Sequence, residues 1–412
     1  MLPHDGTLDS VLGRRPRRGN YFLVLCIGLV VLNLSTFAYH LTGASAFNLV
    51  SNALGVGLMA YSVLELLRAG ARGRTGARFL LLASAAALPS LLLNAPDVSA
   101  VDVLKYLSVF IFFAAGQCHR GPSLSVEGYA YIVLAAAPIL FMGIGASRIY
   151  DREAVGYLPN ANTAVLYMSS ILFAASQMLG NRAIILQLVN AAVMNKIGAL
   201  AATLGAVALW IAFPIRKEAI VGGTVVVVVC IAALMLGAFD RAIGVFETLS
   251  FVFKVDPRAV ASMPYKELVQ LTGATDLSAF FRLIHWSNIL DLYSSGIDTL
   301  LFGYGAGQTP ALTFAGLVPH NDYLRILAEY GPASLFVFVC FLVHVRGSLD
   351  SGPAKVLFLV LCIYFFSENL IDNFTSMALF FAHAGRMSRS RAAAALTRHP
   401  VALYSVALDH GR

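Results

Sequence analysis

Charged residues are scarce in this chain. Asp, Glu, Lys and Arg make up 12% of its 412 residues, against roughly 25% in an average soluble domain, while 58% are hydrophobic. Apolar runs of about 20 residues, the length that crosses a bilayer, recur along most of the chain. Long runs such as AIVGGTVVVVVCIAALMLGAF lack the alternation that membrane barrel strands require. We therefore predict an all-α polytopic membrane protein.

Cysteine is also rare. None of the five cysteines belongs to a CxxC pair, and each lies inside or at the end of an apolar run. A disulfide framework and a cysteine metal cluster are therefore not expected. We interpret these residues as small apolar packing groups. They are Cys26, Cys118, Cys230, Cys340 and Cys362.

Several ligand classes have no sequence signal. The net charge of +7 comes from basic residues in short loops between apolar runs, which indicates membrane topology and no nucleic-acid partner. The run FGYGAGQTP resembles a phosphate-binding loop only superficially, because no Lys-Ser/Thr pair follows it. No acidic pair suited to Mg²⁺ stands out on the predicted external face, so we expect neither a metal nor another cofactor.

The topology follows from the basic loops. Lys and Arg gather in the N-terminal segment, in the loop after the second span and in the C-terminal tail, so these parts should be cytoplasmic. A long mixed segment at 240–320 precedes the last three spans and should be external. Parity then requires two short helices in 183–213, broken near Asn195 and Lys196, and about 12 transmembrane helices in all. The candidate spans are 20–41, 46–67, 79–93, 101–118, 128–146, 161–180, 183–213, 219–239, 323–345, 355–371 and 373–385.

The predicted organisation is one membrane domain with one external loop domain between helices 9 and 10. Its parts are a cytoplasmic segment at 1–19, helices 1–9 at 20–239, the loop domain at 240–322, helices 10–12 at 323–385 and a cytoplasmic tail at 386–412.

This topology places an unusual set of polar residues on the external face. Asn321, Arg325 and Glu329 follow one another at spacings of four and should share one face of a helix. Ionisable groups at membrane depth usually face a cavity and mark function. The others in the set are Arg148, Arg152, Asn160, Lys196, Arg282, His285 and His320.

Each of these residues also has a plainer interpretation. Arg148 stands among acidic residues, as in an ion-paired surface loop, and Lys196 can snorkel to the interface. His320 can cap the following helix, although Asn321 would do so better. Taken together, the residues predict a basic cavity with one histidine able to accept a proton.

Such a cavity suits a particular substrate. Cations stabilise a diphosphate, and the arginine fork matches phosphate oxygens. A histidine near neutral pKa can deprotonate a hydroxyl, and a cavity open to lipid suits a hydrocarbon anchor. The combination predicts glycosyl transfer from a polyprenyl-diphosphate sugar.

The stretch PHNDYLRILAEYG resembles the His-Asn-x-Tyr-Leu-x-x-Leu-x-Glu-x-Gly signature of the bacterial O-antigen ligase and O-antigen/exopolysaccharide polymerase superfamily. Upstream, FRLIHWSNIL and LLFGYGAGQ resemble the family's Arg-x-x-x-Trp segment and Gly-x-Gly stretch, here Arg282, Trp286, Gly303 and Gly305. SRIYDREAVGYLPNANT resembles the Arg and Pro-Asn residues that precede a central helix. The resemblance covers residues 145–385.

The resemblance implies a GT-C-like fold and a metal-independent, inverting glycosyltransferase with an undecaprenyl-diphosphate-linked glycan as donor. His320 would activate the acceptor hydroxyl, while Arg282, with Lys196 or Arg148, would hold the diphosphate. Lys196 is a departure, since it stands where the family often has arginine, and the bidentate fork is lost. Arg325 is counted with the diphosphate-binding residues. The supporting residues implied are Asn160, Trp286, Asn321, Tyr323 and Glu329.

Two functions fit this donor site equally well. A polymerase would join lipid-linked repeat units into a surface polysaccharide, and a ligase would transfer the finished glycan to lipid A core or another acceptor. We favour the polymerase, although the residues themselves do not separate the two functions. A lipid-linked glycan flippase and a scaffold subunit are alternatives of other classes, although no internal repeat supports a flippase. The expected location is the bacterial inner membrane with a periplasmic active site, and the expected partners are the lipid bilayer and a chain-length regulator and flippase of the same pathway.

Overall fold

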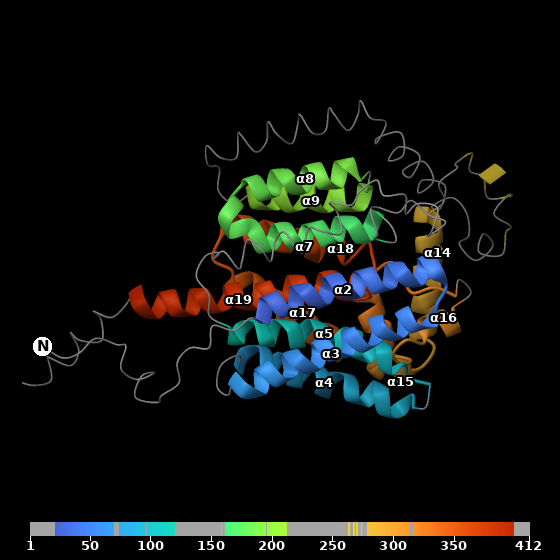
Figure 1. The fold of residues 1–412 in the computed structure, drawn as a ribbon. Coiled ribbons are helices and arrows are strands. Elements are labelled where there is room, and N and C mark those ends of the chain that lie inside the picture. Colours follow the sequence, from blue (N-terminus) through green and yellow to red (C-terminus); the bar gives the residue numbers. More distant parts are fainter. Residues whose placement is uncertain are drawn as a thin grey trace, which may run out of the picture.

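The computed structural model describes residues 21–69, 74–95, 97–119, 158, 161–194, 196–211, isolated positions from 263 to 273, 278–313 and 316–398, with side chains as far as residue 388. The regular structure over these residues is α-helical and confirms the predicted class (Figure 1). The helices are α2 Tyr21–Thr42, α3 Ser45–Ala69, α4 Arg74–Leu93, α5 Ala100–Cys118, α7 Ala161–Leu179, α8 Arg182–Val193, α9 Ile197–Ile211, α14 Ser278–Tyr293, α15 Ile297–Phe302, α16 Thr309–Leu312, α17 Asp322–Ser348, α18 Gly352–Tyr364 and α19 Phe374–Arg398.

Five of the described helices are long and apolar enough to cross a membrane: α2, α3, α4 from Thr75, α5 and α17. Three more, α8, α18 and the Gly198–Trp210 part of α9, are apolar but shorter. All of these helices except α18 expose large apolar side chains, as expected of helices that face lipid. The chain therefore has the character of a multi-pass membrane protein. The predicted spans 128–146 and 219–239 lie outside the described residues, so the total of about 12 spans stays a prediction.

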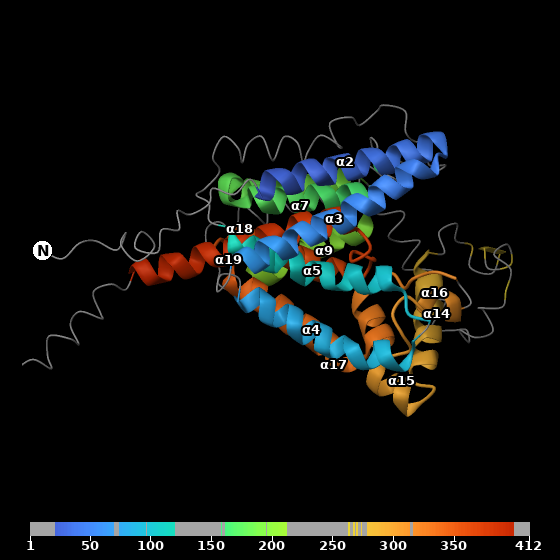
Figure 2. The same cartoon turned by 60° about the horizontal axis from the view of Figure 1, so that its bottom comes forward.

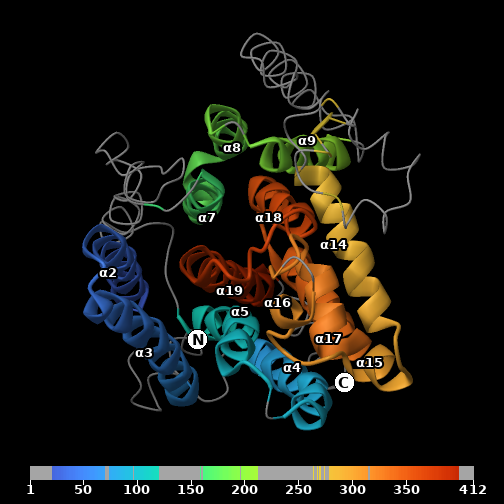
Figure 3. The same cartoon turned by 90° about the vertical axis from the view of Figure 1, so that its right-hand side faces the viewer.

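The centre of the bundle is the pair α5 and α19 (Figure 3). Their backbones touch, because a Cβ on Gly116 or Gly385 would collide with the carbonyl of Ala382 or Phe113. Small residues of this kind allow the close helix approach on which membrane proteins rely in place of hydrophobic collapse. α7, α2 and α17 pack around α19.

The turns of the bundle alternate between its two ends. The turns after α2, α4 and α8 lie at the end that carries α14, α15 and α16, which we call the α14 end (Figures 1 and 2). Arg68 ends α3, Arg74 begins α4 and Arg386 lies in the second half of α19, all at the opposite end. This separation is the one that the basic loops predicted.

The break in the segment 183–213 is confirmed. α8 ends at Val193 and α9 begins at Ile197, so that Lys196 lies between two short helices. The two helices pack against each other, and the turn between them lies at the α14 end.

Two other helix ends differ from the prediction. The span expected at 355–371 is wrong in its last part, because α18 ends at Tyr364 and residues 365–373 are not helical. The predicted continuation depended on apolarity alone, whereas the backbone N–H groups of Leu370 and Ile371 donate to the carboxylate of Asp322. The last helix continues beyond residue 385 to Arg398.

α17 consists of two helical pieces joined at Gly331, whose backbone is left-handed (φ 84°) and is followed by Pro332. The glycine-rich turn after α15 packs against the first piece. Tyr304 and Gly305 donate backbone hydrogen bonds to the carbonyls of Ala328 and Glu329 at 2.9 and 3.2 Å. This glycine run is therefore a packing element between α15 and α17.

Alanine at Gly303 is expected to destabilise the fold strongly. Gly303 has φ of 75°, and a Cβ there would lie 2.6 Å from the backbone carbon of Glu329. Strain and overpacking each cost about 1–3 kcal/mol. Gly316 is the matched control, since its φ is 60° but nothing lies within 4 Å of the added Cβ. In detergent, the midpoint temperature of thermal unfolding for Gly303→Ala should be well below that for Gly316→Ala. Equal midpoints for the two variants would contradict this account.

Candidate functional site

Two residues predicted to be catalytic converge on one carboxylate at the α14 end. Arg282 lies on α14 and His320 lies two residues before α17. Arg282 Nη2 donates to Glu368 Oε1 at 2.9 Å, and His320 Nδ1 lies 3.3 Å from Glu368 Oε2. Glu368 belongs to the non-helical segment 365–373. Three segments that are distant in the sequence thus form one polar group, which we call the Arg–Glu–His cluster.

The three side chains of this cluster differ in exposure. The side chain of His320 is 41% exposed and that of Arg282 is 30% exposed, whereas Glu368 is 12% exposed. The carboxylate is therefore sheltered behind a cation and an imidazole that both reach the surface. Arg282 uses one of its five N–H groups on Glu368 and has the others for further acceptors.

Glu368 is the site residue that sequence reasoning missed. The apolar run 355–371 suggested a helix through this position, so the glutamate was read as part of a span. The signal that could have identified it is the polar triplet Ser367, Glu368 and Asn369 at the external end of that run. Such a triplet is costly in lipid and favours an exit from the membrane.

The segment that carries Glu368 is held at both ends by Asp322. The backbone N–H of Asp322 donates to the carbonyl of Phe365 at 2.8 Å. Its buried carboxylate accepts from the N–H groups of Leu370 and Ile371 at 2.6 and 3.2 Å. Because His320 is two residues from Asp322, the same contacts set the distance between His320 and Glu368.

Aromatic residues of α14 pack beside the cluster. The ring of Trp286 lies edge-on to Phe366 with 5.4 Å between centroids, which attaches α14 to the segment 365–373. His285 Nε2 and Thr313 Oγ1 are 3.1 Å apart. Burial, with a smaller effect of nearby His320, lowers the pKa of His285 below its usual range. His285 is thus a neutral structural residue near pH 7.

Asn321 and Tyr323 support α17. Asn321 is the N-cap residue, and its side chain accepts from the N–H of Leu324 at 3.0 Å. The plainer interpretation of His320 as the helix cap is therefore wrong. Tyr323 donates its hydroxyl to the carbonyl of Cys362 at 2.7 Å, which links α17 to α18.

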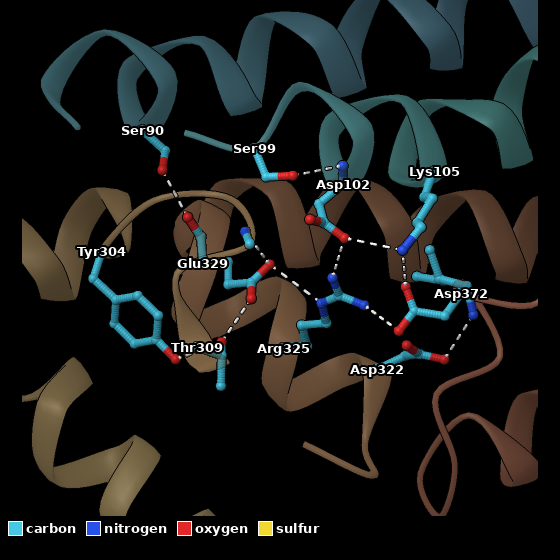
Figure 4. Close-up of polar contacts among 12 residues, drawn as sticks. Ser90, Ser99, Asp102, Lys105, Tyr304, Thr309, Asp322, Arg325, Glu329 and Asp372 are labelled. Carbon is cyan, nitrogen blue, oxygen red and sulfur yellow. Dashed lines mark hydrogen bonds and ion pairs between the residues drawn. The ribbon is translucent and has the colours of Figure 1, made fainter. Parts of the chain in front are cut away.

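Arg325 has a different environment from Arg282. Its guanidinium lies 2.8 Å from Asp102 Oδ1, 3.2 Å from Glu329 Oε2 and 2.9 Å from Asp372 Oδ2, and its side chain is 5% exposed (Figure 4). Lys105 Nζ also contacts Asp102 and Asp372, at 3.3 and 2.8 Å. We call these five residues the buried ion network. It joins α5, α17 and the segment just before α19.

Glu329 extends this network to the glycine run. Its carboxylate accepts from Thr309 Oγ1 at 2.6 Å and from the N–H of Gly307 at 3.0 Å (Figure 4). The carbonyl of Glu329 accepts from Ser90 of α4 at 2.7 Å. Arg325 and Glu329 contact each other, which confirms that they share a face of α17 as predicted. Their other partners are groups inside the protein.

Lys196 is half-buried at the break between α8 and α9. A Cβ on Gly198, two residues later, would lie 3.3 Å from Ser367 Oγ, so the start of α9 contacts the segment that carries Glu368 directly. The fold therefore brings the helix break close to the Arg–Glu–His cluster. The remaining predicted residues, Arg148 and Asn160, lie outside the described residues.

Among the described residues, no group of three or more His, Cys, Asp and Glu side chains is arranged to hold a metal ion. The cluster has other chemistry to offer. It combines a guanidinium that can bind an anion, an imidazole that can accept a proton and a carboxylate that orients both.

No protein-family model matches the chain, and no curated protein sequence matches it either. The Arg–Glu–His cluster is therefore the observation that points to a function.

Proposed function

We propose that the protein is a membrane glycosyltransferase that polymerises undecaprenyl-diphosphate-linked repeat units into a surface polysaccharide. The observation that carries this proposal is the meeting of Arg282 and His320 on Glu368. A cation for a diphosphate and a base for a hydroxyl are the two groups that such a transfer needs, and here they share one carboxylate.

The contact between His320 and Glu368 suggests which nitrogen acts. The Glu368 carboxylate lies within ion-pair distance of Nδ1, at 3.3 Å, but not in hydrogen-bond geometry. We infer that its negative charge favours a proton on Nδ1, which leaves the lone pair on Nε2. Nε2 accepts the proton of the acceptor hydroxyl as the oxygen attacks the anomeric carbon. A carboxylate behind the ring also stabilises the imidazolium that results.

Arg282 acts on the leaving group. As the bond between the acceptor and the anomeric carbon forms, the bond to the diphosphate breaks and negative charge collects on the phosphate oxygens. The N–H groups of Arg282 not used by Glu368 stabilise that charge. Lys196, on the neighbouring helix break, and Arg148 are the further cations that we assign to the diphosphate.

Arg325 is better assigned to the scaffold. Every contact described for its guanidinium is with a carboxylate, and its side chain is almost fully buried. We therefore assign to it the task of holding α5, α17 and the segment before α19 together, which in turn positions Asp322 and Glu368.

The second candidate is a ligase that transfers a finished glycan from the same carrier. It requires the same donor contacts, and the Arg–Glu–His cluster serves both reactions. A flippase is the candidate of another class. The polar residues of the cluster gather at one end of the bundle, the α14 end, and this one-sided location favours transfer chemistry over transport.

The experiment that tests the proposal uses the native host. The gene is deleted and complemented with wild type or His320→Ala, and surface glycans and lipid-linked intermediates are resolved by gel electrophoresis and mass spectrometry. Single repeat units on the acceptor, with both the deletion and the variant, support a polymerase. Long chains that accumulate on the carrier identify a ligase. Normal glycans with membrane-inserted His320→Ala would remove the cluster from the mechanism.

A further inference from the structure

The segment 278–302 exposes large apolar side chains although it was predicted to lie in an external loop domain. Ile297 is 67% exposed and Leu301 is 50% exposed. Phe281, Leu290 and Leu300 are also exposed. Scattered exposed apolar residues are ordinary, but several on one short stretch mark a surface that is covered by something.

The exposed residues of α15 share one side. At about 100° per residue, Ile297, Leu300 and Leu301 fall within an arc of about 100°. Thr299 lies opposite and points inward, where its hydroxyl donates to the carbonyl of Tyr293 at 2.8 Å. α15 is therefore attached to α14 through one face and presents an apolar face outward.

This apolar face continues the lipid-facing surface of the bundle. α15 packs against α4 and α17, and a Cβ on Gly331 would lie 2.6 Å from the carbonyl oxygen of Leu301. Phe336 of α17 is 69% exposed and follows Gly331 by five residues, or about 7.5 Å along the helix. On α4, Leu92 is exposed as well. The face of α15 thus lies next to the outermost lipid-facing residues of two spans.

The direction of α14 also fits a location at the membrane surface. Figures 2 and 3 show α14 lying across the end of the bundle, whereas the neighbouring spans run along the bundle axis. A helix across the end of a bundle lies in the plane of the membrane surface. The turn between α14 and α15 exposes Asp291, Ser294, Ser295 and Asp298, which suits contact with headgroups and water.

We propose that the α14–α15 elbow, residues 290–301, is inserted into the surface of the bilayer at the α14 end. Ile297, Leu300 and Leu301 reach the boundary between headgroups and acyl chains, a depth typical of interfacial helices. The partner of this surface is lipid, identified by its continuity with the lipid-facing sides of α4 and α17. The inference concerns lipid contact alone and does not depend on the proposed reaction.

The elbow also has a consequence for the cluster. Arg282 lies on α14, two turns before Leu290. An inserted elbow holds α14 at a constant height over the bilayer and keeps the guanidinium near the level of lipid phosphates.

The test places an environment-sensitive fluorophore at single cysteines in the full-length protein in phosphatidylcholine nanodiscs. Leu301→Cys and Ile297→Cys are the test positions, Asp298→Cys is the matched control on the same helix, and Val343→Cys of α17 reports lipid. Wild type labelled in parallel corrects for the native cysteines. At the test positions we expect a blue-shifted spectrum, quenching by lipids spin-labelled near the headgroup and loss of quenching by iodide. At Asp298→Cys we expect no blue shift, little quenching by spin-labelled lipid and strong quenching by iodide.

Two results would overturn the inference. The first is quenching of both test positions by iodide, as strong as at Asp298→Cys, with no effect of spin-labelled lipid. The second is protection from both quenchers together with intermolecular disulfide formation by Leu301→Cys, because it would show that a second copy of the chain covers this face. Two test positions ensure that failure of one variant to fold leaves the other to decide.

Discussion

Replacing His320 by alanine is expected to slow glycan transfer by about 10²–10⁴-fold, because the transfer loses the group that accepts the hydroxyl proton. The side chain of His320 is 41% exposed and its described ion-pair contact is with Glu368 alone, so the variant should remain folded. The measurement is a single-turnover assay in nanodiscs with a synthetic polyprenyl-diphosphate repeat unit, with products resolved by mass spectrometry.

Variants of the partner residues sharpen this prediction. Glu368→Gln keeps the size of the side chain but removes the charge that orients the imidazole, so it should lower the rate less than His320→Ala does. His40→Ala is the matched control, since His40 is an exposed histidine at the end of α2, at the same end of the bundle. A wild-type transfer rate with His320→Ala, or a lowered transfer rate with His40→Ala, would contradict the assignment of His320 as the base.

Replacing Arg325 by methionine is expected to lower the free energy of unfolding by about 3–5 kcal/mol, because it leaves the fully buried carboxylate of Glu329 without its cation. Asp102, Glu329 and Asp372 all contact its guanidinium, and the side chain of Glu329 is fully buried. Thermal unfolding in detergent and the yield of folded protein from membranes measure the effect. Arg325→Lys keeps the charge but loses the planar guanidinium fork. Its free energy of unfolding should lie between those of Arg325→Met and wild type.

Arg282→Met is the matched control for this second prediction. Its ion pair with Glu368 is partly exposed, and such pairs contribute about 0–1 kcal/mol to stability. We therefore expect Arg282→Met to unfold near wild type yet to lose transfer activity. If instead Arg325→Met is as stable as wild type and loses only donor binding, Arg325 belongs with the diphosphate-binding residues after all.

The parts of the fold that were predictable are those that local patterns control. The long apolar runs located α2 to α5 within a few residues, because a buried or lipid-facing helix needs about 20 consecutive apolar residues. The break at Lys196 followed from charge and parity, and the N-cap role of Asn321 followed from side-chain chemistry. Each of these signals lies within a few residues of the feature it predicts.

The site shows the opposite case. Arg282 and His320 were singled out by their residue types and by resemblance, but the sequence contains no indication that both contact Glu368. Arg325 illustrates the same gap, since a lone arginine near a helix start suggests a ligand-binding cation. Two of its three carboxylate partners come from α5 and from the segment before α19, more than 200 residues upstream and about 50 downstream.

The amino-acid sequence by itself determined that this chain is an all-helical membrane protein, where α2, α3, α5 and α7 begin and end, and which ionisable residues lie near the ends of the apolar runs. These properties depend on hydrophobicity and capping, which act between neighbours in the chain. Only the tertiary structure decided that Arg282, His320 and Glu368 form one cluster and that Arg325 is enclosed by carboxylates. Ion pairs between distant segments depend on how the helices pack, because a shift of one helix by a single residue would separate the charged atoms by more than the length of a hydrogen bond.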